Sequence, residues 1–88
     1  LKDLDRAIDL SPNDAQYYNN RADLYTDYLD QDDKALLDYA KAISISTDYY
    51  QTARALNNRA NIYRSRGEHE LAINEYTQAI EILENHLL

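Results

Sequence analysis

The sequence contains no cysteine, methionine, phenylalanine or tryptophan, and only one glycine and one proline in 88 residues. Without cysteine there are no disulfides, no thiolate nucleophiles and no cysteine-based zinc sites. The scarcity of glycine and proline favours helix, because these residues interrupt helices most strongly. No apolar run approaches the roughly 20 residues that a helix needs to span a bilayer. Because methionine is absent and the chain begins Leu1-Lys2-Asp3, we expect a piece of a longer protein.

What the chain has instead is tyrosine and negative charge. Its nine tyrosines are the whole aromatic set. A tyrosine ring packs while its hydroxyl reaches water or a polar partner, which suits a thin, two-layer helical protein. The net charge of −7 argues against nucleic acid or an anionic membrane surface as a partner.

One pattern is written twice. The segment at 18–25 reads YNNRADLY and the segment at 56–63 reads LNNRANIY. Each is followed by Ala-x3-Tyr-x2-Ala-Ile, at 35–43 and at 72–80, and part of this second pattern occurs earlier at 4–8. Spacings of three and four residues place the apolar side chains on one face of a helix. The sequence therefore predicts a repeated pair of helices.

Turn-forming residues separate these patterns and predict five helices, at about 1–11, 15–29, 33–46, 51–66 and 69–86. Asp14 is placed to cap the second helix, and Gly67 can take a positive φ after the fourth. The short connections predict antiparallel neighbours. Tyr25 to Ala35 is one residue longer than Tyr63 to Ala72, which places one extra residue in the acidic turn at 30–33. Ala42 to Ala60 is three residues longer than Ala7 to Ala22, which places three extra residues around 48–52, and we expect both insertions to lie between helices.

These positions resemble the tetratricopeptide repeat family, in which the first helix of each repeat carries a large residue, a small residue and an aromatic, and the second carries Ala, an aromatic and Ala. The residues that match are Tyr18, Ala22, Tyr25, Ala35, Tyr39 and Ala42, then Leu56, Ala60, Tyr63, Ala72, Tyr76 and Ala79, with Pro12 as a closing proline. The resemblance implies an all-α solenoid of antiparallel helix pairs. Residues 1–14 would be the second helix of a truncated repeat, and 15–48 and 53–86 two full repeats, in one continuous domain.

The chain departs from the family pattern at Arg21 and Arg59, which stand where the family usually has leucine. A charged side chain in a packed layer needs a partner. We expect Arg21 to pair with Asp38 or Asp3, and Arg59 with Glu75 or Asp38. On the principle that a buried ion pair adds little net stability, we expect Arg59→Leu to be tolerated.

By the same resemblance, the first helix of each repeat lines a concave groove that binds a peptide or a partner helix. The expected groove residues are Gln16, Asn19, Asn20, Asp23, Thr26 and Asp27, then Arg54, Asn57, Asn58, Asn61, Arg64 and Ser65. An asparagine amide both donates and accepts, so it can bind a peptide backbone whatever its side chains. Asp23 and Asp27 lie on one stretch of this groove, and Arg54 and Arg64 lie on the next. This division of charge would suit a partner with a basic segment followed by an acidic one. The alternative is that these side chains are simply solvated.

Nothing in the sequence supports catalysis or a metal site, so we expect no enzyme activity and no cofactor. The acidic run at 30–33 lacks the glycine and the closing glutamate of a calcium loop, and His69 and His86 are expected on the surface. We expect a cytoplasmic scaffold with a protein or peptide partner. The alternative is a structural segment that stacks on further repeats or self-associates through its ends, where the apolar residues are Leu1, Leu4, Ile80, Ile82, Leu83, Leu87 and Leu88.

Overall fold

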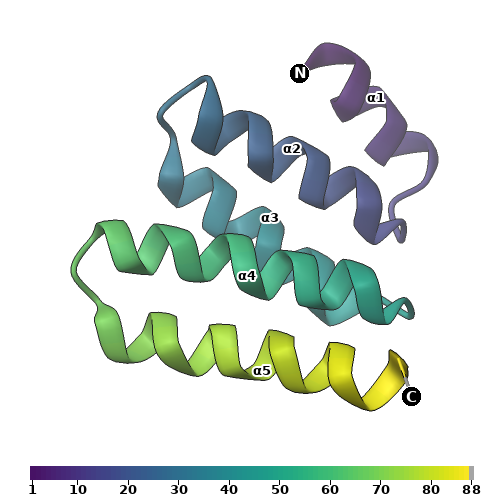
Figure 1. The fold of residues 1–88 in the computed structure, drawn as a ribbon. Coiled ribbons are helices and arrows are strands. Elements are labelled where there is room, and N and C mark those ends of the chain that lie inside the picture. The colour runs from purple at the N-terminus through teal and green to yellow at the C-terminus, as the bar shows by residue number, and fades with distance from the viewer. Residues whose placement is uncertain (88) are drawn as a thin grey trace.

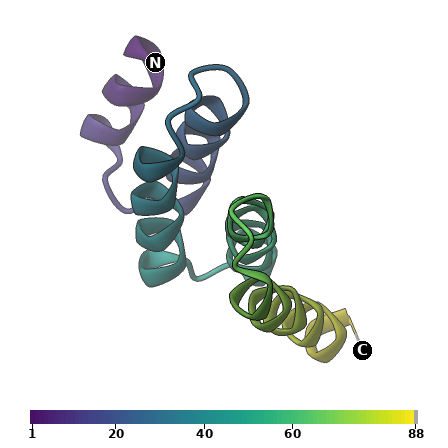
Figure 2. The ribbon, with the colours of Figure 1, turned by 90° about the vertical axis from the view of Figure 1, so that its left-hand side faces the viewer.

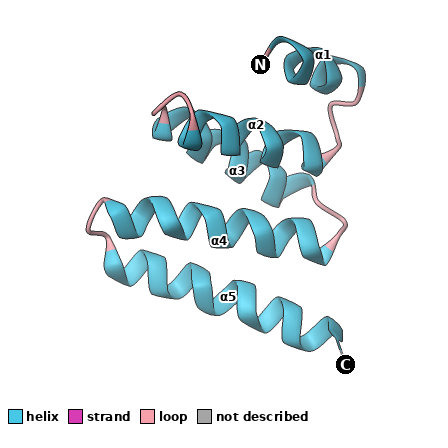
Figure 3. Cartoon of the chain, turned by 45° about the horizontal axis from the view of Figure 1, so that its top comes forward, coloured by secondary structure: helices cyan, strands magenta, loops and turns pink. Residues whose placement is uncertain are grey.

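The computed structural model describes residues 1–87, with side chains as far as residue 86, and within this range the chain folds into five helices (Figures 1 and 3). They are α1 (Lys2–Leu10), α2 (Ala15–Asp27), α3 (Asp32–Ile45), α4 (Tyr49–Ser65) and α5 (His69–Leu87). The predicted fold class, an all-α stack of antiparallel helix pairs, is confirmed. The expectation that Leu87 and Leu88 expose apolar side chains lies outside the described side chains.

The helices begin and end where local chemistry requires. The Asp14 carboxylate accepts the backbone N–H of Gln16 at 3.0 Å, as predicted, and Asp48 caps α4 in the same way. These carboxylates satisfy backbone donors that have no partner inside the helix. Gly67 turns the chain into α5 at φ 79°, a region that glycine enters without steric cost. Asp30 takes φ 51° in the connection between α2 and α3, whereas Asp32 and Asp33, the second half of the expected acidic turn, form the start of α3.

The other insertion does not lie between helices. Residues 49–52 form the first turn of α4, which has 17 residues against 13 in α2. The expected helix start at 51 was therefore two residues late, because the Asp48 cap places the beginning of the helix directly after it. The added turn brings Gln51 beside α2 and Tyr49 beside α5.

The helices form a slab of 33 × 32 × 16 Å (Figure 2). Its shortest dimension, 16 Å, corresponds to two layers of helices. α2 pairs with α3 and α4 pairs with α5, while α4 also contacts both α3 and α2, and α1 packs on α2. α4 therefore joins the pair α4–α5 to the pair α2–α3.

Alanines fill the centre of the slab. Ala22, Ala35, Ala42 and Ala60 are fully buried, which lets neighbouring helix backbones approach closely. Tyr39 is 2% exposed and fills the space beside them. The repeat pattern read from the sequence therefore marks the core correctly.

The two arginines in the packed layer have the predicted partners. Arg21 donates to both carboxylate oxygens of Asp38, at 2.8 and 2.9 Å, and Arg59 donates to both oxygens of Glu75. The hydrogen bond to Asp38 raises the pKa of Arg21 above its ordinary value, and the bond to Glu75 does the same for Arg59. Asp3 is not the second partner of Arg21. Asp5 of α1 takes that place and accepts from Arg21 Nη1 at 2.9 Å.

Apolar side chains remain at the surface near both ends of the stack. Leu1 is 43% exposed, Ile80 55% and Leu83 36%, whereas Ile82 is half-buried against the contact between α4 and α5 and was wrongly expected to be exposed. Over the described residues, no helix combines the length and apolarity that crossing a membrane would take.

Candidate functional site

A polar hollow lies between α2 and α4, with Tyr39 of α3 as its floor. Its volume is about 300 Å³, and it is lined by Asp23, Thr26, Asp27, Tyr39, Asn58 and Asn61. Five of these residues belong to the set expected to line a groove. The sixth, Tyr39, was identified from the sequence only as a packing residue, because a core position and a cavity floor give the same helical spacing.

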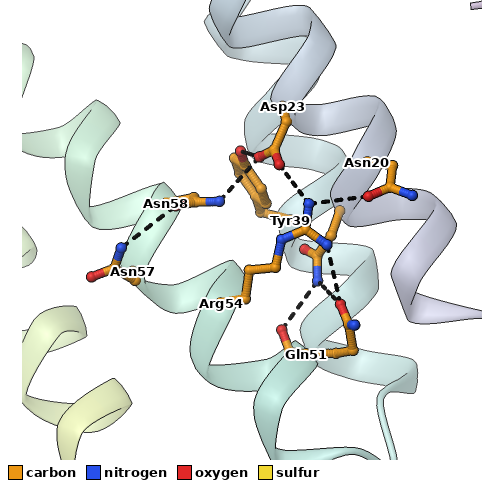
Figure 4. Close-up of polar contacts among 8 residues, drawn as sticks. Asn20, Asp23, Tyr39, Gln51, Arg54, Asn57 and Asn58 are labelled. Atoms are coloured by element: carbon orange, nitrogen blue, oxygen red, sulfur yellow. Dashed lines mark hydrogen bonds and ion pairs between the residues drawn. The ribbon is translucent and has the colours of Figure 1, made fainter.

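Asp23 is the centre of the hydrogen bonds beneath this hollow (Figure 4). Its carboxylate accepts from Arg54 Nη2 at 2.6 Å, from Asn58 Nδ2 at 3.0 Å and from the Tyr39 hydroxyl. Burial raises the pKa of Tyr39, and the neighbouring Asp23 carboxylate raises it further. The tyrosine therefore stays a neutral donor at physiological pH, and one carboxylate joins α2, α3 and α4.

A second group of contacts holds the start of α4 against α2. Arg54 Nη2 also donates to Asn20 Oδ1 at 3.0 Å. Asn19 is fully buried, and its amide donates to the backbone carbonyl of Gln51 at 3.1 Å and to the Gln51 side chain at 2.9 Å. Gln51 was missed in the sequence, since it lies among the extra residues around 48–52, which have no counterpart in the connection before α2.

The expected groove residues therefore divide into two groups. Asn19, Asn20, Asp23, Arg54 and Asn58 bind one another, Gln51 and Tyr39 inside the molecule, and Asn19 offers no surface to a partner. The residues that remain exposed are Gln16, Asp27, Asn57, Asn61, Arg64 and Ser65, while Thr26 is half-buried. The sequence pattern could not separate these groups, because polar side chains at helical spacing look alike whether they face a neighbouring helix or solvent.

The expected acidic and basic stretches of the groove neutralise each other at its centre. Asp23 and Arg54, which were placed on separate stretches, form an ion pair at 2.6 Å. The charges left exposed are Asp27 on α2 and Arg64 on α4. The Arg64 guanidinium lies 6.0 Å from the centroid of the Tyr76 ring, and the Tyr76 hydroxyl donates to Asn61.

The remaining candidate residues take part in ordinary surface contacts. Asp33 of the acidic turn pairs with Arg66 at 2.8 Å, and this bond raises the pKa of Arg66. His69 and His86 are exposed, and the His86 ring stacks on Tyr49 with centroids 3.3 Å apart. Among the described residues, no three histidine or acidic side chains gather closely enough to hold a metal ion.

Comparison with protein families agrees with this architecture. The family model described as tetratricopeptide repeat matches residues 15–85, which include α2, α3, α4 and most of α5. Comparison with curated proteins and with solved structures returned no significant match. Repeats of this family form non-catalytic scaffolds for protein–protein interaction. The chain, with its stacked helix pairs and buried alanines, belongs to the tetratricopeptide repeat family.

Proposed function

We propose that this scaffold binds an extended peptide segment of a partner protein in the hollow between α2 and α4. The observation that carries the proposal is the hollow itself, which is open, about 300 Å³ in volume and lined almost wholly by polar side chains. The net charge of −7 supports a protein partner over nucleic acid.

The groups on the rim of the hollow favour a particular peptide chemistry. Asn61 offers an exposed side-chain amide that can bind a peptide backbone. Asp27 is exposed and suits a lysine or arginine. Because Arg54 already neutralises Asp23, Asp27 supplies the attraction for a single basic residue.

A display experiment tests the proposal. Peptides are selected from a random library on the immobilised chain, and their affinities for variants are measured by fluorescence polarisation. We expect Asp27→Asn and Asn61→Ala each to weaken binding by about tenfold, which corresponds to about 1.4 kcal/mol. Asp9→Asn removes the same charge from an exposed position on α1 and should leave the affinity within about twofold.

The selected peptides should also carry a basic residue, and the effect of Asp27→Asn should shrink at high salt. Peptides that bind both hollow variants as tightly as the unchanged chain would place the binding surface elsewhere and refute the proposal.

We also propose a division of the chain into repeats, based on contacts that recur along it. Residues 15–48 and 53–86 form two repeats, and 1–14 is the second helix of a preceding one. The recurrence of the arginine–carboxylate pair, Arg21 with Asp38 and Arg59 with Glu75, supports this division.

A further inference from the structure

A pocket of about 440 Å³ lies where the connection between α1 and α2 meets the connection between α3 and α4. Residues 11–16 line it on one side, and residues 45–48 with Gln51 line it on the other. Both connections lie at the same edge of the slab, on the right in Figures 1 and 3. The hollow between α2 and α4 lies further along α2, from Asp23 onward, so the two cavities are separate. We call the cavity between the connections the loop pocket.

The loop pocket has two carboxylates in its wall, those of Asp14 and Asp48. Of its described lining residues, none is a lysine, arginine or histidine. Each carboxylate uses Oδ1 to cap a helix, at 3.0 Å for Asp14 on α2 and at 2.9 Å for Asp48 on α4. Within the described part of the chain, no residue donates to the second oxygen, Oδ2, of either carboxylate. Each aspartate therefore keeps one oxygen for an added donor.

The helix ends at this edge leave the negative charge of the loop pocket in place. α2 and α4 begin here and bring about half an elementary positive charge each, while α1 and α3 end here and bring about half a negative charge each. These contributions offset one another, so the two carboxylates determine the charge. Arg54 reaches the Gln51 side chain at 3.4 Å, but Asp23 already neutralises Arg54 at 2.6 Å. The loop pocket is therefore suited to a cation.

Apolar side chains form another part of the same wall. Pro12, Ala15 and Ile45 line the loop pocket. Ala15 is buried and Ile45 packs against the hydrophobic core, so this part of the wall is held in place by the fold. Long basic side chains place their methylene groups along such apolar surface and keep the charged head among polar groups. The cation that fits is therefore one at the end of an apolar stem.

We propose that the loop pocket binds the guanidinium group of an arginine side chain of a partner protein. A guanidinium is planar and donates N–H groups from both of its edges, so it can pair with Asp14 and Asp48 at once. A lysine ammonium is a compact and more strongly hydrated charge, and it loses more water for the same two acceptors. The stem of the arginine lies along Pro12 and Ile45. This binding does not depend on the peptide site between α2 and α4.

Blocked amino acids test the proposal, because they present one side chain on an uncharged backbone. N-acetyl-arginine N-methylamide and its lysine and citrulline counterparts are titrated to millimolar concentration into ¹⁵N-labelled chain at low salt, and amide chemical shifts are followed by NMR. We expect the arginine compound to bind about threefold more tightly than the lysine compound. Citrulline has nearly the same shape without the charge, and it should bind about tenfold more weakly than arginine. The backbone amides of residues 13–16 and 46–51 should shift most.

Variants that preserve the helix caps locate the bound guanidinium. Asp14→Asn and Asp48→Asn remove the charge but keep an oxygen that caps a helix as well as aspartate does, so thermal unfolding should be nearly unchanged. Each should weaken the arginine compound about fivefold, through loss of a hydrogen bond between charged groups. Asp14→Ser and Asp48→Ser also keep the caps and should give the same result. Asp27→Asn removes the same charge near the other end of α2 and should have no effect, which separates this test from that of the peptide site.

Several outcomes would overturn the proposal. They are equal binding of the citrulline and arginine compounds, an affinity unchanged by both Asp14→Asn and Asp48→Asn, shifts confined to residues around Asp27 and Asn61, or no shifts at millimolar concentration. An affinity that added salt leaves unchanged would also exclude the ionic pairing. Free arginine is titrated in parallel, and tighter binding of free arginine than of the blocked compound would assign the loop pocket to a small molecule in place of a partner's side chain.

Discussion

Replacing Arg59 by leucine tests what the ion pairs between helices contribute. Arg59 Nη2 donates to Glu75 Oε2 at 2.6 Å, and the two side chains are 22% and 6% exposed. The sequence alone suggests that the substitution is tolerated or even stabilising, because a buried ion pair adds little net stability. The geometry reverses this expectation, since Arg59→Leu leaves the Glu75 carboxylate buried between α4 and α5 with neither water nor a cation to stabilise its charge.

The magnitude follows from that burial. Removing one partner of a buried ion pair costs about 3–5 kcal/mol. An 88-residue domain is stable by about 4–13 kcal/mol in total. A loss of about 3 kcal/mol would lower the melting temperature by roughly 12 °C or more, since about 1 kcal/mol corresponds to 4–8 °C in a domain of this size.

The double variant Arg59→Leu/Glu75→Leu separates the pair from the isolated charge. Replacing both partners removes the buried charge and restores apolar contact, so we expect stability close to that of the unchanged chain or above it. Circular dichroism at 222 nm during urea and thermal unfolding at pH 7 measures all variants. A single variant within about 1 kcal/mol of the unchanged chain, or a double variant as unstable as the single one, would refute the reasoning.

Three further predictions concern single residues. Because the pKa of Tyr39 is raised, the folded chain keeps the hydroxyl proton above pH ~10, where the unfolded chain releases it. The free energy of unfolding is therefore at its full value below that pH and falls by about 1.4 kcal/mol per pH unit above it. Alkaline urea titrations should show a shallower fall for Tyr39→Phe, and the unchanged slope for Tyr50→Phe, at a site 63% exposed. Asp48→Ala should cost about 1 kcal/mol through the lost cap of α4, and equal stability by urea unfolding would contradict it. Gly67→Ala should cost about 1 kcal/mol, because the φ of 79° is unfavourable for alanine although no atom lies within 4 Å of the added Cβ. Gly67→Asn should lose less stability, because asparagine is better tolerated at positive φ. A reversal of that order in thermal unfolding would argue against backbone strain at this position.

The sequence by itself determined the fold class and the core. Residues such as Ala22 and Ala60 recur at helical spacing with tyrosines beside them, and this pattern requires a buried face whichever way the helices turn. Turn chemistry was equally local, so the roles of Asp14 and Gly67 were predictable. The partners of Arg21 and Arg59 were predictable in part, because the repeat fixes which helices are neighbours.

Only the tertiary structure decided which polar residues are free to bind a partner. Asn19 and Asn57 occupy equivalent positions in nearly identical segments, yet the first is fully buried and the second is exposed. The difference is that α4 covers the first, and its added turn places Gln51 within hydrogen-bonding distance. A polar side chain carries no local signal of whether a neighbouring helix or water satisfies its hydrogen bonds. That outcome depends on how helices far apart in sequence pack together, which a repeat pattern leaves open.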